Sequence, residues 1–131
     1  MRRHSLTIHI CMRVRMRDLA LQAAGVLAIL VAIAHGIIVE RKVFARVRIE
    51  PQRTRGLLRM LCQASTLDWI GIGVLLIAAP TLGSDAARLW IIAVAIIVYG
   101  YAAIGNAVAT RGRHIGWLLM TCVVGFALMG L

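Results

Sequence analysis

Four stretches of the sequence consist almost entirely of apolar residues, and basic clusters or turn residues separate them. They cover about residues 19–39, 57–79, 88–110 and 115–131. A membrane-crossing helix needs about 20 mostly apolar residues, so the last stretch, with 17, is at the lower limit. Backbone polar groups in lipid must be satisfied within the segment, which favours helices. The sequence predicts an all-α, polytopic membrane protein with four transmembrane helices in an antiparallel up-down bundle.

The overall composition points the same way. Hydrophobic residues make up 61% of the 131 residues and charged residues only 15%. Soluble domains are nearer 45–50% apolar and 25% charged. A chain of this size leaves much of its surface outside the core, so lipid is expected to cover much of the apolar excess.

The basic residues flank the apolar stretches. Five of the 15 Lys and Arg residues lie in a basic N-terminal tail, residues 1–18, which we expect to be poorly ordered or interfacial. Seven lie in residues 41–59, and we expect residues 41–56 to form a basic loop. Charges at these places set the orientation of membrane helices, so we expect anionic lipid headgroups rather than nucleic acid as their partner.

Counting Lys and Arg predicts the orientation. The first and third connections share one side of a four-span protein and carry seven and two such residues, against six on the other side. The positive-inside rule places these loops in the cytoplasm and both termini outside. Translation from Met16 instead of Met1 would sharpen the contrast to nine against two, which mildly favours the later start.

Several kinds of catalytic or cofactor site lack support. The three cysteines form no CxxC or zinc-ligand spacing, and the serines have no accompanying base. Gly71-x-Gly73 lacks the third glycine and the strand-to-helix context of a nucleotide site. We therefore expect a protein that is not an enzyme, with no catalytic residue, metal or cofactor.

Asp68, near the middle of the second stretch, is the strongest site candidate. An ionisable residue at this depth is costly and is a functional hypothesis by default, here a proton- or cation-coupled carboxylate. Two structural alternatives remain open. Ser65-x-x-Asp68 resembles a capping box at an interfacial helix start. Asp68 could instead be buried and hydrogen-bonded to Tyr99, Tyr101 or Asn106.

The other candidate polar residues lie near the cytoplasmic end of the first two helices. His35 and Gln63 are expected at similar depth with Asp68 deeper, as a polar track between these helices. Glu40 can pair with Arg41 or Arg59, or hold His35, although residues five apart on a helix are poor partners and an interfacial glutamate is the simpler interpretation. His114 is expected at a depth similar to His35, so the two could bind haem or a metal or relay protons, although the simpler interpretation is that His35 is hydrogen-bonded in the bundle and His114 is an interfacial residue.

Small residues recur every four positions in the first stretch. Such spacing lets a neighbouring helix backbone approach closely, although it is also what an alanine-rich membrane helix contains by composition. The residues are Ala20, Ala24, Ala28, Ala32 and Gly36.

Two short motifs carry a resemblance. His35–Arg41 and, after the basic loop, Ser65–Trp69 resemble small uncharacterised bacterial inner-membrane proteins with an H-[GS]-x-x-x-E-R exit from the first helix. Those proteins have Trp-His before the Ser/Thr pair, where this chain has Cys62-Gln63, so a histidine pair across the first two helices is lost. The resemblance covers about a third of the chain, implies a four-helix fold and a bacterial origin, and brings no known activity.

Three functions follow as hypotheses. The first is an accessory or structural subunit of a membrane complex, and small-residue faces and polar helix ties would suit it. The second is an oligomeric proton- or ion-coupled transporter or channel component using Asp68. The third is a haem-binding redox protein using His35 and His114.

Overall fold

Residues 2–131 fold as four α-helices. The computed structural model describes the backbone of residues 2–131 and the side chains from Met12 onward, and this part of the chain contains no strand. The all-helical prediction is confirmed. The helices are α1 (Arg2–Ile38), α2 (Gln52–Ala78), α3 (Asp85–Thr110) and α4 (Gly116–Met129). A π-helix, η1 (Val39–Phe44), extends α1, and a 3₁₀-helix, η2 (Ala79–Thr81), follows α2.

Three helical segments are long and apolar enough to cross a membrane: Met12–Phe44, Gln52–Thr81 and Asp85–Thr110. Helix α4 is apolar but has only 14 residues. At 1.5 Å per residue it is about 21 Å long, against a hydrocarbon core of about 30 Å.

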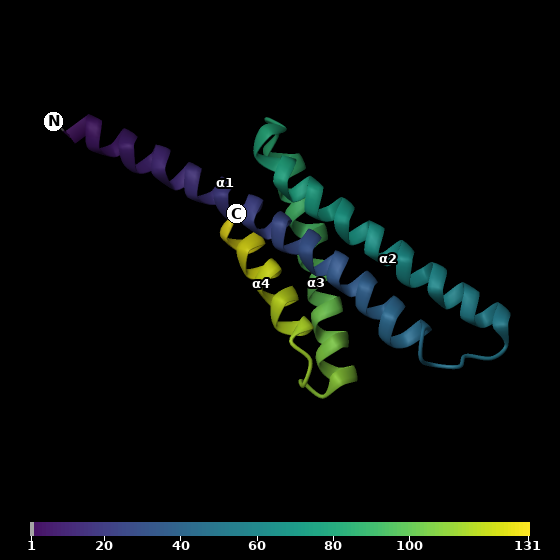
Figure 1. The fold of residues 1–131 in the computed structure, drawn as a ribbon. Helices are drawn as coiled ribbons and strands as arrows, with labels where there is room; N and C mark the ends of the chain where they lie inside the picture. The colour runs from purple at the N-terminus through teal and green to yellow at the C-terminus, as the bar shows by residue number, and fades with distance from the viewer. Residues whose placement is uncertain (1) are drawn as a thin grey trace.

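The helix boundaries differ most from prediction at the N-terminus. Helix α1 begins at Arg2, where an interfacial or poorly ordered tail was expected up to residue 18. Figure 1 shows this first part of α1 projecting beyond the other helices. Arginine is a good helix former. The arginines that precede the apolar stretch therefore limit where lipid can surround the chain, but they do not interrupt the helix. Helix α2 also begins early, directly after Pro51, which occupies its N-cap.

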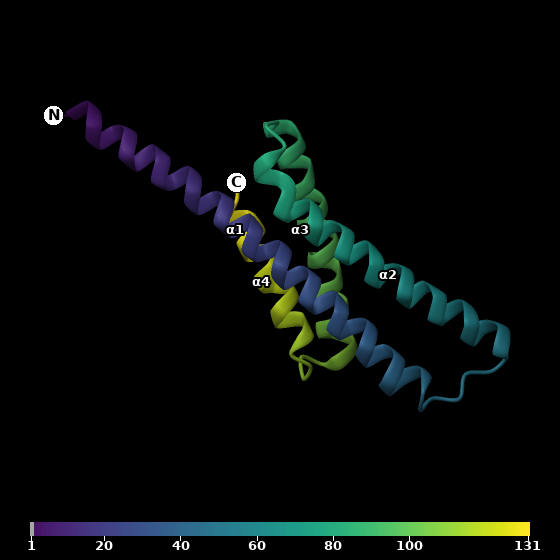
Figure 2. The same cartoon turned by 45° about the horizontal axis from the view of Figure 1, so that its top comes forward.

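The helices pack as two hairpins. Helices α1 and α2 lie side by side, as do α3 and α4, and α4 also packs against α1 (Figures 1 and 2). Helices α2 and α3 meet near their short connection and diverge toward their other ends. The basic connection after α1 and the connection between α3 and α4 both lie at the lower end of the molecule in Figure 1.

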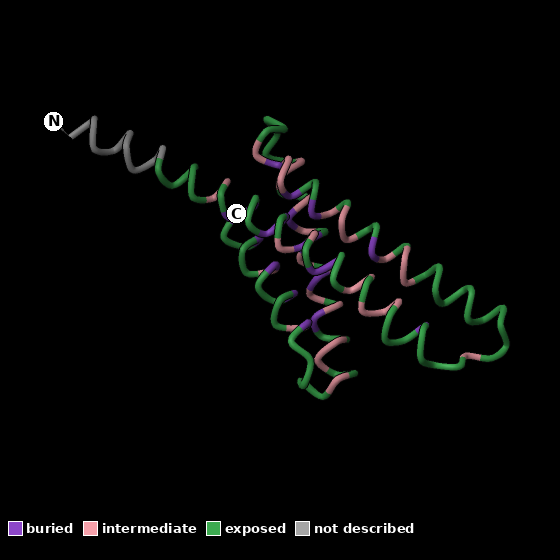
Figure 3. Tube along the Cα trace, in the orientation of Figure 1, coloured by how far each residue is buried: buried purple, intermediate pink, exposed green. Residues whose placement is uncertain are grey.

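The buried residues line the contacts among all four helices. One cluster includes Leu21, Leu76, Ile92 and Ala127, and a second includes Tyr99 and Met120. Figure 3 shows buried positions on the facing sides and exposed positions over the outside. Much of that outside is apolar, with Met60 73% and Ile97 69% exposed. Water-soluble monomers rarely expose apolar patches on this scale, so the surface is compatible with lipid.

Two glycines form a close approach of α1 and α2. A Cβ atom placed on Gly73 would lie 2.9 Å from the carbonyl oxygen of Gly25 and 2.7 Å from Cγ1 of Ile29. The stripe of small residues in α1 borders this contact, because Ala24, Ala28 and Ala32 are fully buried. Gly25, one position off that stripe, is the residue that meets the neighbouring backbone.

Candidate functional site

A polar cluster joins the C-terminal end of the first predicted span to the N-terminal half of α2. Arg59 Nε donates to Glu40 Oε2 at 3.0 Å, and its second nitrogen bonds to Oε1 of the same carboxylate. Gln63 Nε2 donates to Glu40 Oε2 at 3.4 Å. Arg59 and Gln63 are four residues apart, so they share one face of α2. Of the partners considered for Glu40, the structure places Arg59 against it, and the pair is bidentate, which is the stronger geometry for arginine.

The Glu40 cluster ties helices together instead of presenting a free acid. Its ion pair is partly exposed, with side-chain exposures of 58% for Arg59 and 36% for Glu40. A groove of about 400 Å³ runs beside it and includes Gly36, Gln63 and Thr66. Arg55 strengthens the same end by donating to the carbonyl oxygen of Phe44 at 2.5 Å. These contacts hold the basic connection against the start of α2.

Three aromatic rings link α1, α2 and α3 deeper in the molecule. The ring centroids of His35 and Trp69 are 5.0 Å apart, and those of Trp69 and Tyr99 are 5.6 Å apart. The hydroxyl of the fully buried Tyr99 donates to the carbonyl oxygen of Trp69 at 3.0 Å. Tyr99 therefore bonds to α2 through Trp69 and not through Asp68. Trp69 was not among the predicted site residues.

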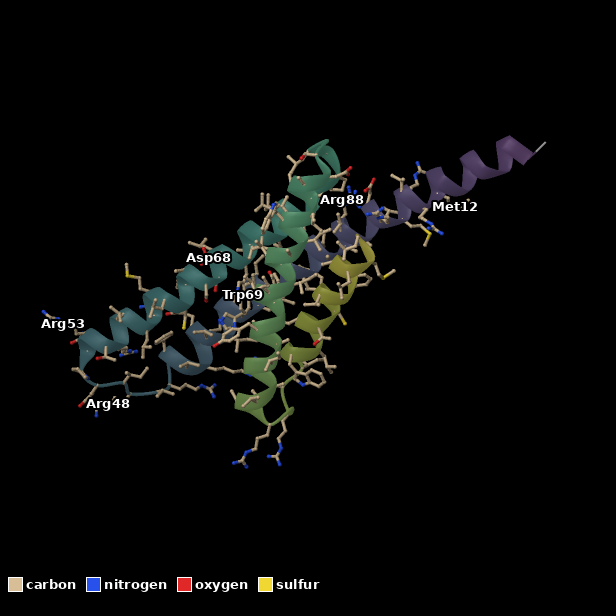
Figure 4. The ribbon with its side chains drawn as sticks, turned by 180° about the vertical axis from the view of Figure 1, so that it is seen from behind. Met12, Arg48, Arg53, Asp68, Trp69 and Arg88 are labelled. Carbon is tan, nitrogen blue, oxygen red and sulfur yellow. The ribbon has the colours of Figure 1, made fainter. Side chains whose placement is uncertain are left out.

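Asp68 lies on the outer surface of α2. Figure 4 shows Asp68 and Trp69 on different sides of that helix, about 100° apart as consecutive helix residues are, and Trp69 packs against Tyr99 of α3. Its side chain is exposed, and no hydrogen bond or ion pair joins it to another side chain described from Met12 onward. The structure thus brings His35, Gln63 and Glu40 to the contact of α1 with α2 and leaves Asp68 outside it.

The capping alternative for Asp68 is wrong. Helix α2 is continuous from Gln52 to Ala78, so Ser65 lies well inside it. The Ser65 hydroxyl donates to the carbonyl oxygen of Cys62 at 2.8 Å, as serine does within a helix, and does not cap a helix start.

His114 and Asn106 lie near the start of α4. His114 is exposed, and its Nδ1 accepts a hydrogen bond from the backbone N–H of Gly116 at 3.0 Å. The side-chain oxygen of Asn106 is buried and has no hydrogen-bond partner. Among the side chains from Met12 onward, no group of three or more His, Cys, Asp or Glu is placed to hold a metal ion.

A second polar cluster lies at the opposite end of the molecule and was not predicted. Arg88 Nη1 donates to Asp18 Oδ1 at 2.7 Å, and Arg88 Nη2 donates to the carbonyl oxygen of Gly130 at 3.0 Å. Figure 4 shows Arg88 at the α3 end of this contact. The pair is more buried than Glu40–Arg59, with side-chain exposures of 16% for Arg88 and 31% for Asp18. It joins α1, α3 and the end of α4.

The sequence held a signal for this contact. Asp18 and Arg88 each stand at the start of an apolar stretch, and in a four-span protein the first and third helices start on the same side. Opposite charges at those two starts predict an ion pair between Asp18 and Arg88. The count of Lys and Arg residues used for the orientation does not consider such pairs.

No protein-family model matches the chain, and neither the curated proteins nor the solved structures contain a match to it.

Proposed function

We propose that this chain is a small multi-pass protein of the bacterial inner membrane that acts as an accessory or structural subunit, and that the outer face of α2 docks onto another membrane protein. The observation that carries the proposal is the position of Asp68. It is exposed on the outside of a helix that is long and apolar enough to cross a membrane. Ionisable residues in membrane spans normally face a protein interior or a water-filled cavity.

The depth of Asp68 makes an exposed position costly. The spanning segment runs from Gln52 to Thr81. Asp68 lies about 24 Å along the axis from its start and about 20 Å from its end, at 1.5 Å per residue. A carboxylate near the middle of a bilayer costs about 2.5–3.5 kcal/mol on insertion scales. A partner that pairs with this group removes that cost.

The surface around Asp68 suits a neighbouring helix. Ala64 and Gly71 lie one turn away on either side and are exposed, and a Cβ atom on Gly71 would meet nothing within 4 Å. Small residues at such positions allow close helix packing in membranes. Leu61 and Leu75 continue the exposed face in both directions.

Charge complementarity defines the partner. Asp68 is the only charged residue of α2 between Met60 and Ala78. A second copy packed through the same face would bring two carboxylates together, which disfavours ionisation of both. The partner is therefore a transmembrane helix of a different protein, and this helix carries a Lys, Arg or His at the depth of Asp68.

The remaining polar groups fit a structural role. The clusters at Glu40 and Asp18 tie helix ends together, and Tyr99 ties α3 to α2. A coupled-transport role would need Asp68 to line a path for protons or ions. Because Asp68 lies on the outer surface, only an oligomer could enclose such a path.

The proposed membrane arrangement has four spans, with short α4 as the fourth. Both termini lie outside, and the basic connection faces the cytoplasm with its arginines against anionic headgroups. The placement of the Asp18–Arg88 cluster and Gly130 at one end, away from Glu40 and Arg59, supports this topology.

Affinity purification from native membranes in mild detergent tests the docking proposal. Wild type is compared with Asp68→Asn, Asp68→Leu and the control Asp85→Asn, which changes an exposed acid in the first turn of α3. We expect one membrane protein to co-purify with wild type and the control and to be lost with Asp68→Leu. Asp68→Lys should bind again when the partner's basic residue is changed to Asp.

Equal recovery with Asp68→Leu would overturn the proposal, as would a charge-reversed pair that fails to bind. Recovery only of tagged with untagged copies of the same chain, with no other protein, would show self-association and contradict the partner assignment.

A further inference from the structure

A groove follows the contact between α1 and α2 and changes from polar to apolar along its length. Its volume is about 400 Å³. Glu40, Arg41 and Gln63 line the polar end, and Ile33 and Ile37 line the apolar end. Arg41 lies in the last turn of the first membrane-crossing segment, and Ile33 lies about 12 Å further toward the middle of that segment. The groove therefore runs from the edge of a membrane-crossing helix toward its interior.

The acid at the polar end of the groove is neutralised within the protein. Both carboxylate oxygens of Glu40 bond to Arg59, and Gln63 Nε2 donates to one of them at 3.4 Å. The bidentate ion pair leaves no uncompensated negative charge there to repel an anion. The Gln63 amide nitrogen has a second N–H, and no further hydrogen bond joins it to the residues described from Met12 onward.

Arg41 brings a positive charge to the same end of the groove. It is exposed, and no ion pair or hydrogen bond joins its side chain to another residue described from Met12 onward. A guanidinium group matches the geometry of a phosphate and forms strong charge-assisted bonds with it. Basic pockets between membrane helices recognise anionic lipid headgroups through such contacts. Arg41 and the Gln63 amide therefore offer donors to a phosphate group.

Exposed apolar side chains continue the groove away from Arg41. Ile37 is 47% exposed and Ile33 is 45% exposed, and they lie one turn apart on α1. Gly36 packs against Thr66 of α2, because a Cβ atom on this glycine would lie 3.1 Å from Thr66 Cγ2. The two helices therefore meet there and close the floor of the groove. A hydrocarbon chain that starts from a phosphate at Arg41 can cover both isoleucines.

We infer that this groove binds one anionic phospholipid as a specific ligand. Its phosphate accepts hydrogen bonds from Arg41 and Gln63, and one of its acyl chains lies along Ile37 and Ile33. A zwitterionic phospholipid is a poorer ligand, because the cation in its headgroup repels the guanidinium group. The inference rests on the proposed membrane insertion, and it adds a defined lipid site to the general attraction of the basic connection for headgroups. It uses other residues than the docking face around Asp68.

Native mass spectrometry of the full-length protein in detergent tests the inference. The protein is freed of co-purified lipid and titrated with phosphatidylglycerol, with phosphatidylcholine of the same acyl chains, or with glycerophosphoglycerol, which has the anionic headgroup without chains. We expect the first phosphatidylglycerol to bind about tenfold more tightly than phosphatidylcholine, as one charge-assisted hydrogen bond predicts. Glycerophosphoglycerol should show no binding at concentrations at which phosphatidylglycerol saturates the protein.

Two pairs of variants locate the site. Arg41→Gln should lower phosphatidylglycerol affinity about tenfold, to that of phosphatidylcholine. Arg53→Gln is the matched control, because Arg53 is also exposed and basic but does not line the groove; it should leave affinity unchanged (Figure 4). Ile37→Ala should weaken both lipids about threefold or more through lost apolar contact, whereas Leu30→Ala, which changes an exposed residue of α1 outside the groove, should not.

Equal affinities of the wild-type protein for phosphatidylglycerol and phosphatidylcholine would overturn the inference without requiring any variant to fold. Equal losses with Arg41→Gln and Arg53→Gln would also overturn it, because they would show diffuse attraction by the basic connection. Glycerophosphoglycerol binding as tight as that of the lipid would show an anion site and contradict the lipid assignment. These measurements use purified protein without a partner, so their outcome is separate from that of co-purification through Asp68.

Discussion

The crossing of α1 and α2 at Gly25 and Gly73 predicts a specific sensitivity to a single methyl group. In Gly73→Ala the new Cβ atom would stand 2.7 Å from Ile29 Cγ1 and 2.9 Å from the Gly25 carbonyl oxygen. Non-bonded carbon atoms pack at about 3.5–4.0 Å, so the two helices must separate by roughly 1 Å. Overpacking of this kind costs about 1–3 kcal/mol.

Gly71→Ala is the matched control for this measurement. It lies two residues away on the same helix, and its Cβ atom would meet nothing within 4 Å. Both variants gain the helix preference of alanine over glycine, about 1 kcal/mol. The difference between their free energies of unfolding therefore isolates the cost of the crossing, and we expect Gly73→Ala to be less stable by about 1–3 kcal/mol.

The assay is reversible unfolding in mixed micelles as the mole fraction of sodium dodecyl sulfate increases, followed by tryptophan fluorescence. Gly25→Ala should resemble Gly73→Ala, because its Cβ atom would meet Ile77 and the Gly73 carbonyl oxygen. One separation of the helices relieves both clashes, so the double variant should cost less than the sum of the two. Equal stabilities of Gly73→Ala and Gly71→Ala would refute the close crossing.

Three further predictions concern the polar clusters and the topology. Arg88→Met should cost about 1.5–3 kcal/mol in the same unfolding assay, because Arg88 makes charge-assisted bonds to Asp18 and Gly130; a loss under 0.5 kcal/mol would contradict this. Arg59→Met should cost only about 0.2–1 kcal/mol, because its ion pair with Glu40 is partly exposed; a loss larger than that of Arg88→Met would reverse the assigned ranking. With Cys11, Cys62 and Cys122 replaced by Ser, a cysteine at Asp85 should react with a membrane-impermeant thiol reagent in intact cells and one at Arg48 only after lysis; the opposite pattern would invert the topology.

The existence and order of the helices could be predicted from apolar stretches and turn residues, but their ends could not. Hydropathy indicates which part of a helix lipid can surround, but a helix continues beyond that part when the next residues also favour helical structure. The arginines before Asp18 favour a helix, and α1 begins at Arg2. Pro51, by contrast, blocks a helix interior, and α2 starts directly after it.

The candidate site shows what residue type and depth leave undetermined. Asp68 and Trp69 are adjacent in sequence, yet one faces outward and the other packs between helices, because each residue turns a helix by about 100°. Which side faces the neighbouring helices depends on where α1 and α2 cross, and Gly25 and Gly73 lie in close contact at that crossing. Glu40 had several available partners, and only the packing of η1 against α2 selects Arg59.

Photo-crosslinking in living cells tests the docking of α2 most directly. A photoreactive amino acid is placed at Ala64 or Gly71, beside Asp68, or at Leu118 on the exposed surface of α4 as a control. We predict that Ala64 and Gly71 capture one and the same membrane protein, that this protein has a Lys, Arg or His within a span, and that Asp68→Leu abolishes the capture. The same crosslinks from Leu118, or undiminished crosslinks in the Asp68→Leu background, would contradict the account.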